Sequence, residues 1–465
     1  MVYSISDGEE LPLAEVLASL SYALDLTSGQ PMGHAQASCL IALRIASHLR
    51  LSDDLKSSLY HAMLIKDSGC SSNAARMYAI FGSDERSAKR HSKVVDWTNL
   101  FEAARYAAEH TLPSAGIIQR AGRLLNLATK TEATSKEFME TRCNRGADIA
   151  LTIGLGHNAA ECIRTLDEHW DGHGQPYGLR GDHIPILGRI ACLAQTMEVF
   201  ARTYGVEAAY DVARKRSSRW FDPELVKIAL WFRKDEAFWN EVITDPRQAL
   251  YNLETADNLQ RATRQRIDTI CEVFAQIVDA KSPFTAEHSR RVTQYAVDLG
   301  MAMGFSDVRL HTLRRAALLH DIGKLGVSNA ILDKPGKPTE AEWSSIRAHP
   351  ANTEKILKTI PGFGRITEIA AAHHERLDGN GYFRGLTAQD LDLDMRILAV
   401  ADVFDALSAD RPYRAAMDRS QVYAILDKEA GTGLDSSCVA TVKSLYRNDA
   451  LPTTGFSPEP LRNAA

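Results

Sequence analysis

The stretch LRRAALLHDIGKL, residues 313–325, sets the expectation for the fold. Its apolar residues recur at steps of three and four, which is the spacing of one buried face of an α-helix. The segment VYAILDKEA, residues 422–430, has the same spacing, and alternating strand-like runs are scarce elsewhere. We therefore expect an all-α fold.

The same stretch places two polar residues where an apolar helix ends. His320 and Asp321 follow the run AALL, and Asp402 lies inside the apolar segment MRILAVADVFDAL, residues 395–407. Burying an unpaired imidazole and an unpaired carboxylate side by side costs on the order of several kcal/mol. The cost falls when both groups have a hydrogen-bonding or charged partner. A bound cation satisfies both.

Further histidines extend this set of candidate ligands. Five of the fifteen histidines and two aspartates make up the set: His288, His320, His349, His373, His374, Asp321 and Asp402. Imidazole and carboxylate suit Fe, Mn, Zn, Co or Ni, and the lack of thiolates disfavours a structural zinc site. A buried Asp–His hydrogen bond would explain one such residue, but seven exceed even what one ion needs. We expect two ions, bridged by Asp321.

The chain also contains two copies of one plan. A shift of 254 positions superposes His34 on His288 and Asp67 on Asp321, and further along a shift of 207 superposes Glu168 on Glu375. The first copy is therefore longer by 47 residues, and this extra length lies somewhere between about residues 70 and 165. A two-copy duplication of this kind is not a solenoid, which needs three or more short repeats.

The first copy has lost most of the candidate ligands. Lys66, Leu166, Asp167 and Gln195 stand where the second copy has His320, His373, His374 and Asp402. We expect it to bind no dinuclear centre and to be regulatory, with a lysine ammonium as one replacement for the lost cation. The expected division is a first domain over 1–245, a connecting helix over 246–280, and a catalytic domain over 281–465 that ends in a loose tail.

Composition narrows the class of protein. The 465 residues carry a net charge of −5, with 45% hydrophobic and 24% charged residues, which are ordinary globular values. A weakly acidic chain lacks the basic field that bulk nucleic-acid binding needs. No apolar run is long enough to span a membrane, the N-terminus has no signal-peptide pattern, and the seven cysteines are scattered. We expect a cytoplasmic protein with reduced thiols.

Five segments of the second copy resemble a known family. They are SPFTAEHSRRV (282–292), LLHDIGKLGV (318–327), EWSSIRAHP (342–350), HHERLDGNGYF (373–383) and ADVFDALSADRPYR (401–414). In series they closely resemble the HD-GYP family, a branch of the HD-domain metal phosphohydrolases, over about residues 281–415. The resemblance implies tandem all-α HD-type domains of which the second is catalytic, a two- or three-metal site, and hydrolysis of cyclic dinucleotides, chiefly cyclic di-GMP. The segment EHWDGHGQPYGLRGDHIP, residues 168–185, resembles the family's loop more faintly.

The resemblance also implies roles for individual residues. One metal would be held by His288, His320, Asp321 and Asp402, and the other by Asp321, His349, His373 and His374. The catalytic residues would be Asp321 and Lys324, and Lys324 would contact the scissile phosphate. Further substrate contacts would come from Asp378, Gly379, Gly381, Tyr382, Arg411 and Arg414.

The sequence departs from the family pattern at two positions. Phe383 replaces the proline of the Gly-Tyr-Pro signature, and it does not fix φ as proline does, so substrate fit and docking to partner proteins stay open. Phe284 stands where some members have a glutamate that completes a third metal site, which favours two metals.

The expected chemistry is phosphodiester hydrolysis. A hydroxide bridging two divalent cations, Fe or Mn, would attack phosphorus in line with the ribose 3′ oxygen and open the ring to linear pGpG, with a second cut to GMP left open. A mixed cyclic GMP–AMP dinucleotide or another phosphoester is the first alternative, and a non-catalytic signalling scaffold or nucleotide-binding protein is the second. Signalling proteins or a second copy of the chain are the expected partners.

Overall fold

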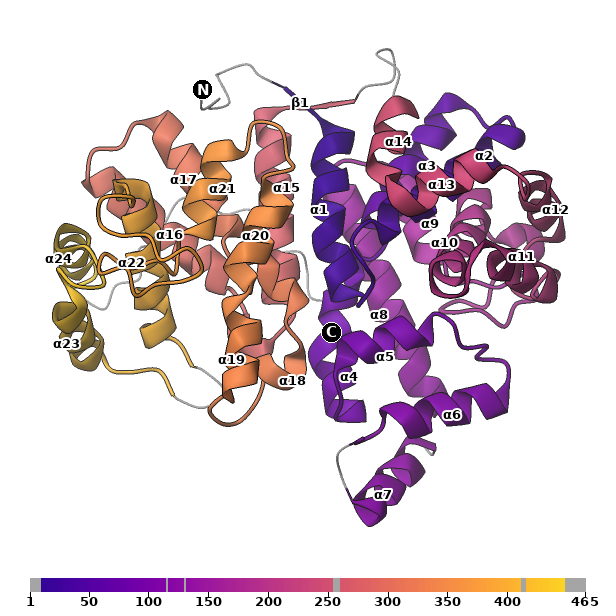
Figure 1. The fold of residues 1–465 in the computed structure, drawn as a ribbon, viewed down its shortest axis with the longest axis horizontal. Coiled ribbons are helices and arrows are strands. Elements are labelled where there is room, and N and C mark those ends of the chain that lie inside the picture. The colour runs from indigo at the N-terminus through magenta and orange to yellow at the C-terminus, as the bar shows by residue number, and fades with distance from the viewer. Residues whose placement is uncertain (1–9, 114–115, 129–130, 254–259, 411–414, 448–465) are drawn as a thin grey trace.

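The computed structural model describes residues 10–113, 116–128, 131–253, 260–410 and 415–447, and almost all of its elements are helices (Figure 1). The expected all-α fold is confirmed. The one sheet among these residues pairs β1, Leu11–Pro12, antiparallel with β2, Arg261–Ala262. It ties together the segments that precede the two copies.

The first copy is built from fourteen α-helices in the described residues. Their bounds are α1 Leu13–Thr27, α2 His34–His48, α3 Asp53–Ile65, α4 Ala74–Phe81, α5 Glu85–Ser92, α6 Leu100–His110, α7 Ile117–Ala128, α8 Thr131–Thr152, α9 His157–Thr165, α10 Ile186–Tyr204, α11 Val206–Lys215, α12 Pro223–Trp231, α13 Glu236–Thr244 and α14 Pro246–Leu253. Short 3₁₀ turns lie at η1, Ser68–Asn73, and at η2, Gly181–His183.

The second copy repeats the plan with fewer helices. Its α-helices are α15 Arg264–Asp279, α16 His288–Ala302, α17 Asp307–Leu319, α18 Asn329–Leu332, α19 Glu340–Arg347, α20 His349–Leu357, α21 Gly364–Ala371, α22 Leu393–Ser408, α23 Arg419–Glu429 and α24 Ser436–Leu445. The 3₁₀ turn η4 is Pro283–Thr285, and η5 is Ile322–Gly326.

The duplication holds at the level of helix bounds. α2 and α3 fall on α16 and α17 at the shift of 254, and α9 begins at the equivalent of α21 at the shift of 207. The extra length of the first copy therefore lies between η1 and the second half of α8. Its helices α6 and α7 project at the lower edge of Figure 1.

Matching glycines explain why the two copies share one backbone. A Cβ on Gly323 would lie 2.0 Å from the carbonyl oxygen of His349, and a Cβ on Gly69 would lie 2.0 Å from that of Arg142. Only glycine lets η5 pack this closely on α20, and η1 on α8. This contact fixes the turn that carries Asp321 in the second copy.

The copies pack on each other reciprocally. α1 contacts η5 and α20, while the equivalent helix α15 contacts η1 and α8. The same patch of each copy is thus used on both sides, as in a twofold dimer interface. One continuous cluster of buried apolar side chains runs through both copies, from Leu11 to Tyr446.

The predicted single connecting helix over residues 246–280 is wrong. α14 packs on α2 and α13 of the first copy, whereas α15 begins only at Arg264, after β2. Thr263 ends the extended segment, because its side chain accepts a hydrogen bond from the amide of Arg266 and so caps α15. The domain boundaries at 245 and 280 stay a prediction, and the loose tail falls outside the described residues.

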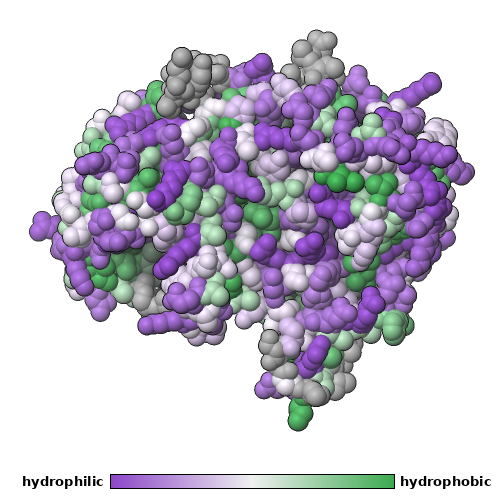
Figure 2. All heavy atoms as spheres, in the orientation of Figure 1, coloured by the Kyte–Doolittle hydropathy of each residue, from purple (hydrophilic) through white to green (hydrophobic). Residues whose placement is uncertain are grey.

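Hydrophilic residues spread over the visible face of the molecule, with hydrophobic ones in small groups (Figure 2). Among the described residues, no helix has the length and apolar character that crossing a membrane requires.

Candidate metal centre

The seven predicted ligands come from five elements that converge at one place. His288 begins α16, His320 and Asp321 join α17 to η5, and His349 begins α20. The pair His373 and His374 follows the end of α21, and Asp402 lies in the middle of α22. All are buried except His374, whose side chain is 23% exposed.

The first group of ligand atoms surrounds one oxygen of each aspartate. Nε2 of His288 lies 3.4 Å from Asp321 Oδ2 and 3.4 Å from Asp402 Oδ1. Nε2 of His320 lies 3.4 Å from the same Asp321 oxygen and 3.9 Å from the same Asp402 oxygen. Two imidazoles and two carboxylates therefore face one point.

The second group surrounds the other oxygen of Asp321. Oδ1 lies 3.3 Å from His349 Nε2 and 3.6 Å from His373 Nε2, and these two nitrogens are 3.0 Å apart. His349, His373 and His374 each offer a ligand atom, all within 4.8 Å of one another. Asp321 thus presents one oxygen to each group, which is the arrangement of a bridging carboxylate.

The imidazoles are held from behind. The Nδ1 atoms of His320, His349 and His373 lie 2.7, 2.7 and 2.6 Å from the carbonyl oxygens of Ala317, Ile346 and Ala370. Because a carbonyl only accepts, each Nδ1 carries the proton and each Nε2 keeps a free lone pair toward the centre.

The donor set fits a cation. Nε2 of His288, Nε2 of His320 and Oδ1 of Asp321 are buried without a hydrogen-bond partner. An orphaned buried polar atom costs on the order of 1–3 kcal/mol, and three such atoms facing one centre are satisfied together by metal ions. The role of the seven side chains as ligands stays a prediction.

The charges of the centre are shifted in opposite directions. Burial alone raises the pKa of Asp321, but the neighbouring His320 and Lys324 hold that pKa well below its ordinary value. Burial lowers the pKa of His349 to about 4, in spite of Asp321. Asp321 is therefore ionised and His349 is neutral, which is the state in which each of these two groups binds metal.

A positive charge is favoured between the aspartates. Burial lowers the pKa of His288, yet Asp321, Asp402 and Asp405 together raise it well above its ordinary value. The same carboxylates would therefore stabilise either a proton on His288 or a metal cation between their oxygens.

Three side chains line the exposed edge of the centre. Lys324 Nζ lies 2.5 Å from Asp321 Oδ2 with 17% of its side chain exposed, and the Tyr382 ring centroid is 4.8 Å from that of His374. Arg347 is exposed and its guanidinium lies 5.9 Å from the Tyr382 ring centroid. Sequence reasoning missed Arg347, although it stands two residues before His349 in EWSSIRAHP.

The glycine-rich loop is braced by its own residues. Asp378 pairs with Arg376 at 2.9 Å, and the positive φ of Gly379, +75°, suits glycine. A Cβ on Gly381 would lie 2.5 Å from Glu375 Cα, so only glycine fits there. Asp378 therefore shapes the loop, and a contact between these residues and substrate stays a prediction.

Sequence reasoning also missed Asp405. Its Oδ2 accepts a hydrogen bond of 2.7 Å from His288 Nδ1, and Arg291 Nε lies 2.6 Å from its other oxygen. The signal was present, because Asp405 stands three residues after Asp402 and so on the same face of α22.

Arg411 and Arg414 lie outside the described residues, and Phe284, in η4, has no ligand atom.

Comparisons with known proteins agree with this geometry. The protein-family model described as HD domain matches residues 62–225 and again residues 272–438, which is more than half of the chain. A Vibrio cholerae protein named 3′3′-cGAMP-specific phosphodiesterase 3 is 41% identical over 433 residues, 93% of this chain and 94% of the relative. The chain belongs to the HD-GYP branch of the HD-domain family. It is a hydrolase of the phosphodiesterase class.

This HD-GYP protein is also similar to two further phosphodiesterases. A crystal structure of a cyclic GMP-AMP-specific phosphodiesterase from V. cholerae has a TM-score of 0.66 and 37% identity, and the match covers 94% of this chain and 98% of that one. The cyclic di-GMP phosphodiesterase response regulator RpfG of Xanthomonas campestris is 31% identical over 209 residues, 44% of this chain and 53% of the regulator.

The first HD copy fills the equivalent place with protein cations. Lys66, at the position of His320, has its ammonium 3.0 Å from His34 Nε2 and forms a salt bridge with Asp67. Lys93 Nζ lies 3.4 Å from the other oxygen of Asp67, and Arg142, at the position of His349, pairs with Asp167. As expected, the ammonium of Lys66 lies at the place where a metal ion is predicted in the second copy.

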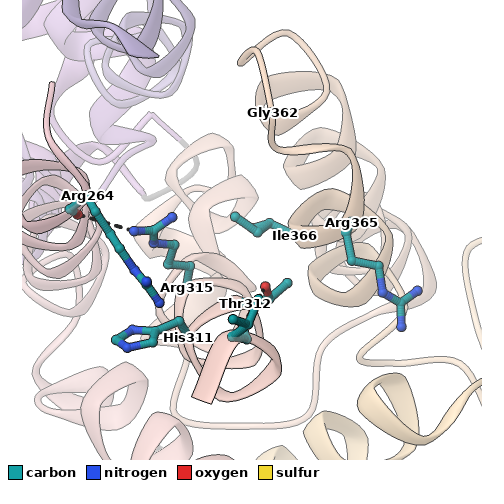
Figure 3. Close-up of a pocket in the computed structure, with 8 residues that line it drawn as sticks. Arg264, His311, Thr312, Arg315, Gly362, Arg365 and Ile366 are labelled. Atoms are coloured by element: carbon teal, nitrogen blue, oxygen red, sulfur yellow. Dashed lines mark hydrogen bonds between the residues drawn. The ribbon is translucent and has the colours of Figure 1, made fainter. Parts of the chain in front are cut away.

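The described residues line a small cavity apart from the predicted ligands and a larger one beside Asp405 and Arg291, which lie behind His288. One, of about 20 Å³, is lined by Arg264, His311, Thr312 and Arg315 among others (Figure 3). It has room for about one water molecule. Arg315 is already paired with Asp268 at 2.6 Å and Arg365 with Asp392 and Asp394, so these two cations are not free to bind a nucleotide.

Proposed function

We propose that the chain hydrolyses a cyclic dinucleotide made of one guanosine and one adenosine, 3′3′-cyclic GMP–AMP. The observation that carries this proposal is the 41% identity over 93% of the chain to a phosphodiesterase named as specific for that dinucleotide. From the sequence alone, cyclic di-GMP is the first expectation and the mixed dinucleotide the second. The relative that matches both copies favours the mixed dinucleotide, while RpfG, a cyclic di-GMP enzyme, matches less than half of the chain.

The cofactor of the proposed reaction is a pair of divalent metal ions, Fe or Mn. His288, His320 and Asp402 would hold one ion, His349, His373 and His374 the other, and Asp321 both. Such ions lower the pKa of water and neutralise charge on the phosphoryl oxygens.

Lys324 supplies the chain's own cation at the reacting phosphate. Its ammonium is already oriented by Asp321 and is partly exposed, so it can contact a phosphoryl oxygen without a large rearrangement. Charge that develops on that oxygen is stabilised by a cation fixed in place beforehand. Arg411 and Arg414 would hold the substrate's phosphates.

In the proposed complex, a purine base of the substrate stacks on the ring of Tyr382. The ring lies against His374, with the Arg347 guanidinium beside it, and aromatic rings and arginine planes both stack on nucleobases. The product is a linear dinucleotide, whose further cleavage depends on how well that product stays bound.

The test combines metal analysis and substrate choice. The purified protein is assayed for bound metals and then incubated separately with equal concentrations of cyclic GMP–AMP, cyclic di-GMP and cyclic di-AMP, with products identified by mass spectrometry. We expect two metals per chain and the fastest hydrolysis of cyclic GMP–AMP. Faster hydrolysis of cyclic di-GMP would overturn the substrate, and no hydrolysis of any of them by metal-loaded protein would overturn the function.

A further inference from the structure

A fully buried salt bridge joins the two copies. Glu85 Oε1 lies 3.2 Å from Lys281 Nζ, and their side chains are 0% and 1% exposed. Glu85 begins α5, in the extra segment of the first copy, and Lys281 follows α15 in the second. Because burying two charges is costly, such a pair persists only where its remaining hydrogen-bonding groups are also satisfied. Those further partners show what the pair holds.

The other oxygen of Glu85 caps a helix of the second copy. Oε2 accepts hydrogen bonds from Ser328 Oγ at 2.8 Å and from the amide of Asn329 at 2.9 Å, where α18 begins. The Asn329 side chain in turn donates to the carbonyl of Lys281 at 2.7 Å. The first copy therefore fixes the segment that directly follows η5.

Two side chains hold the carbonyl groups at the end of η5 itself. Lys281 Nζ, kept in place by Glu85, donates to the carbonyl of Leu325 at 3.3 Å. Arg86, the neighbour of Glu85, donates to the carbonyl of Gly326 and, at 3.2 Å, to that of Leu26 in the first copy. Both carbonyls of the last two residues of η5 are thus bound by groups that depend on α5.

These contacts bear directly on the candidate centre. η5 is only five residues long, Asp321 is its N-cap, and Lys324 lies within it. The amide of Lys324 donates to the carbonyl of Asp321 at 2.8 Å, so the turn moves as a unit. A shift at its last residues therefore displaces the ammonium of Lys324 and the carboxylate of Asp321 together.

We propose that Glu85 and Arg86, from the first copy, are positioning residues for hydrolysis in the second copy. They act through Lys281 and the carbonyls of η5 and touch no substrate. The inference rests on the proposed phosphodiesterase function. It gives the first copy, which lacks its own ligands, a part in the reaction as the support for Lys324 and Asp321.

The test uses the full chain with Arg86→Met and Glu85→Gln. A displacement of the reacting groups by a fraction of an ångström lowers kcat by roughly tenfold or more, while KM for cyclic GMP–AMP stays within about twofold. The matched control is Glu207→Gln, which removes an exposed salt bridge with Arg233 in the same copy and should leave both constants unchanged. A kcat of wild-type size in both variants would overturn the inference.

A double variant separates positioning from folding. Glu85→Gln leaves the Lys281 ammonium buried without its carboxylate, and Lys281→Met removes that unpaired charge. Glu85→Gln with Lys281→Met should therefore melt closer to the wild type than Glu85→Gln alone, yet stay slow, because the carbonyl of Leu325 still lacks its donor. Recovery of kcat together with the melting temperature would mean that the pair only stabilises the fold.

The inference can fail independently of the proposed function. An active wild type with unimpaired variants would refute the positioning role and leave the phosphodiesterase standing. An inactive wild type would refute the function, and hydrogen exchange then decides the inference. The amides of residues 322–327 should exchange faster in the Arg86→Met variant than in Glu207→Gln, and equal rates would overturn it.

Discussion

The centres of the two copies stand on the same backbone and differ in where their positive charge comes from. In the second copy His320 and Asp321 leave buried atoms without partners, whereas in the first copy Lys66 supplies an ammonium between His34 and Asp67. Burial alone raises the pKa of Asp67, but Lys66 and Lys93 hold that pKa well below its ordinary value. A buried carboxylate at this turn thus needs a cation, and either a metal or a side chain can provide it.

The comparison teaches that a copy can lose the candidate ligand residues without losing the fold. An ammonium satisfies the buried carboxylate, but it activates no water and offers no open coordination position. The first copy can therefore keep its helices and its contacts with the second copy without needing a metal ion. Four predictions, each with a control substitution, break or sharpen this contrast.

The largest expected effect comes from removing the shared carboxylate of the second copy. Asp321→Ala should lower kcat by at least roughly a thousandfold, because both groups of ligands lose their common oxygen donor and Lys324 loses its partner. His320→Ala should behave alike, and both should keep the helical circular dichroism signal. The measurement is hydrolysis of cyclic GMP–AMP together with metal content.

The equivalent change in the first copy is the control for that prediction. Asp67→Ala should leave metal content unchanged and reduce the rate far less than Asp321→Ala does. Equal losses of activity from the two substitutions would break the contrast between the copies.

The next effect is on stability. Lys66→Met should lower the free energy of unfolding by about 3 kcal/mol, because it leaves Asp67 buried with fewer cations around it. Denaturant unfolding measures this change, and Lys56→Met is the matched control, since Lys56 pairs with Asp53 on the exposed surface. That control should cost less than about 1 kcal/mol. Equal stability of the two variants would show that no charge is needed in the first copy.

A smaller effect tests the groups behind the ligands. Asp405→Asn should reduce metal affinity or kcat by roughly 10–100-fold, because it weakens the hydrogen bond that orients His288. Glu198 makes the equivalent contact with His34 in the first copy, so Glu198→Gln should change neither metal content nor kcat by that amount. Metal titration of both variants checks this, and a larger loss from Glu198→Gln would reverse the assignment.

Much of this centre could be predicted from the sequence, because its signal is local. His320, Asp321 and Asp402 interrupt apolar helical runs. Matching residues also recur in the same order in the two copies, so the duplication could be predicted. Asp405 and Arg347 were missed because acids and arginines near helix ends are common on surfaces, and only the fold brings them to His288 and Tyr382.

The contact between the copies could not be predicted at all. Glu85 reads as an ordinary helix-starting glutamate after Asp84, and Lys281 as a solvated lysine, since no periodicity relates them. They meet because α5 belongs to an extra segment and packs across a pseudo-twofold interface. Local patterns carry propensity and burial, whereas such a pair depends on how two finished units dock.

The smallest expected effect concerns substrate binding at the exposed edge of the second copy. Arg347→Ala should raise KM for cyclic GMP–AMP by a few-fold, about the 1 kcal/mol that an exposed cation over an aromatic ring contributes, with kcat almost unchanged. The guanidinium is solvated, and in the proposed complex it contacts the base and not the phosphate, so its loss should leave the reacting groups in place. Arg233→Ala, which removes another exposed arginine near a tyrosine in the first copy, is the control in the same steady-state assay. An unchanged KM would remove Arg347 from the substrate site, whereas a fall in kcat as large as that of Asp405→Asn would place it among the groups that act on the phosphate.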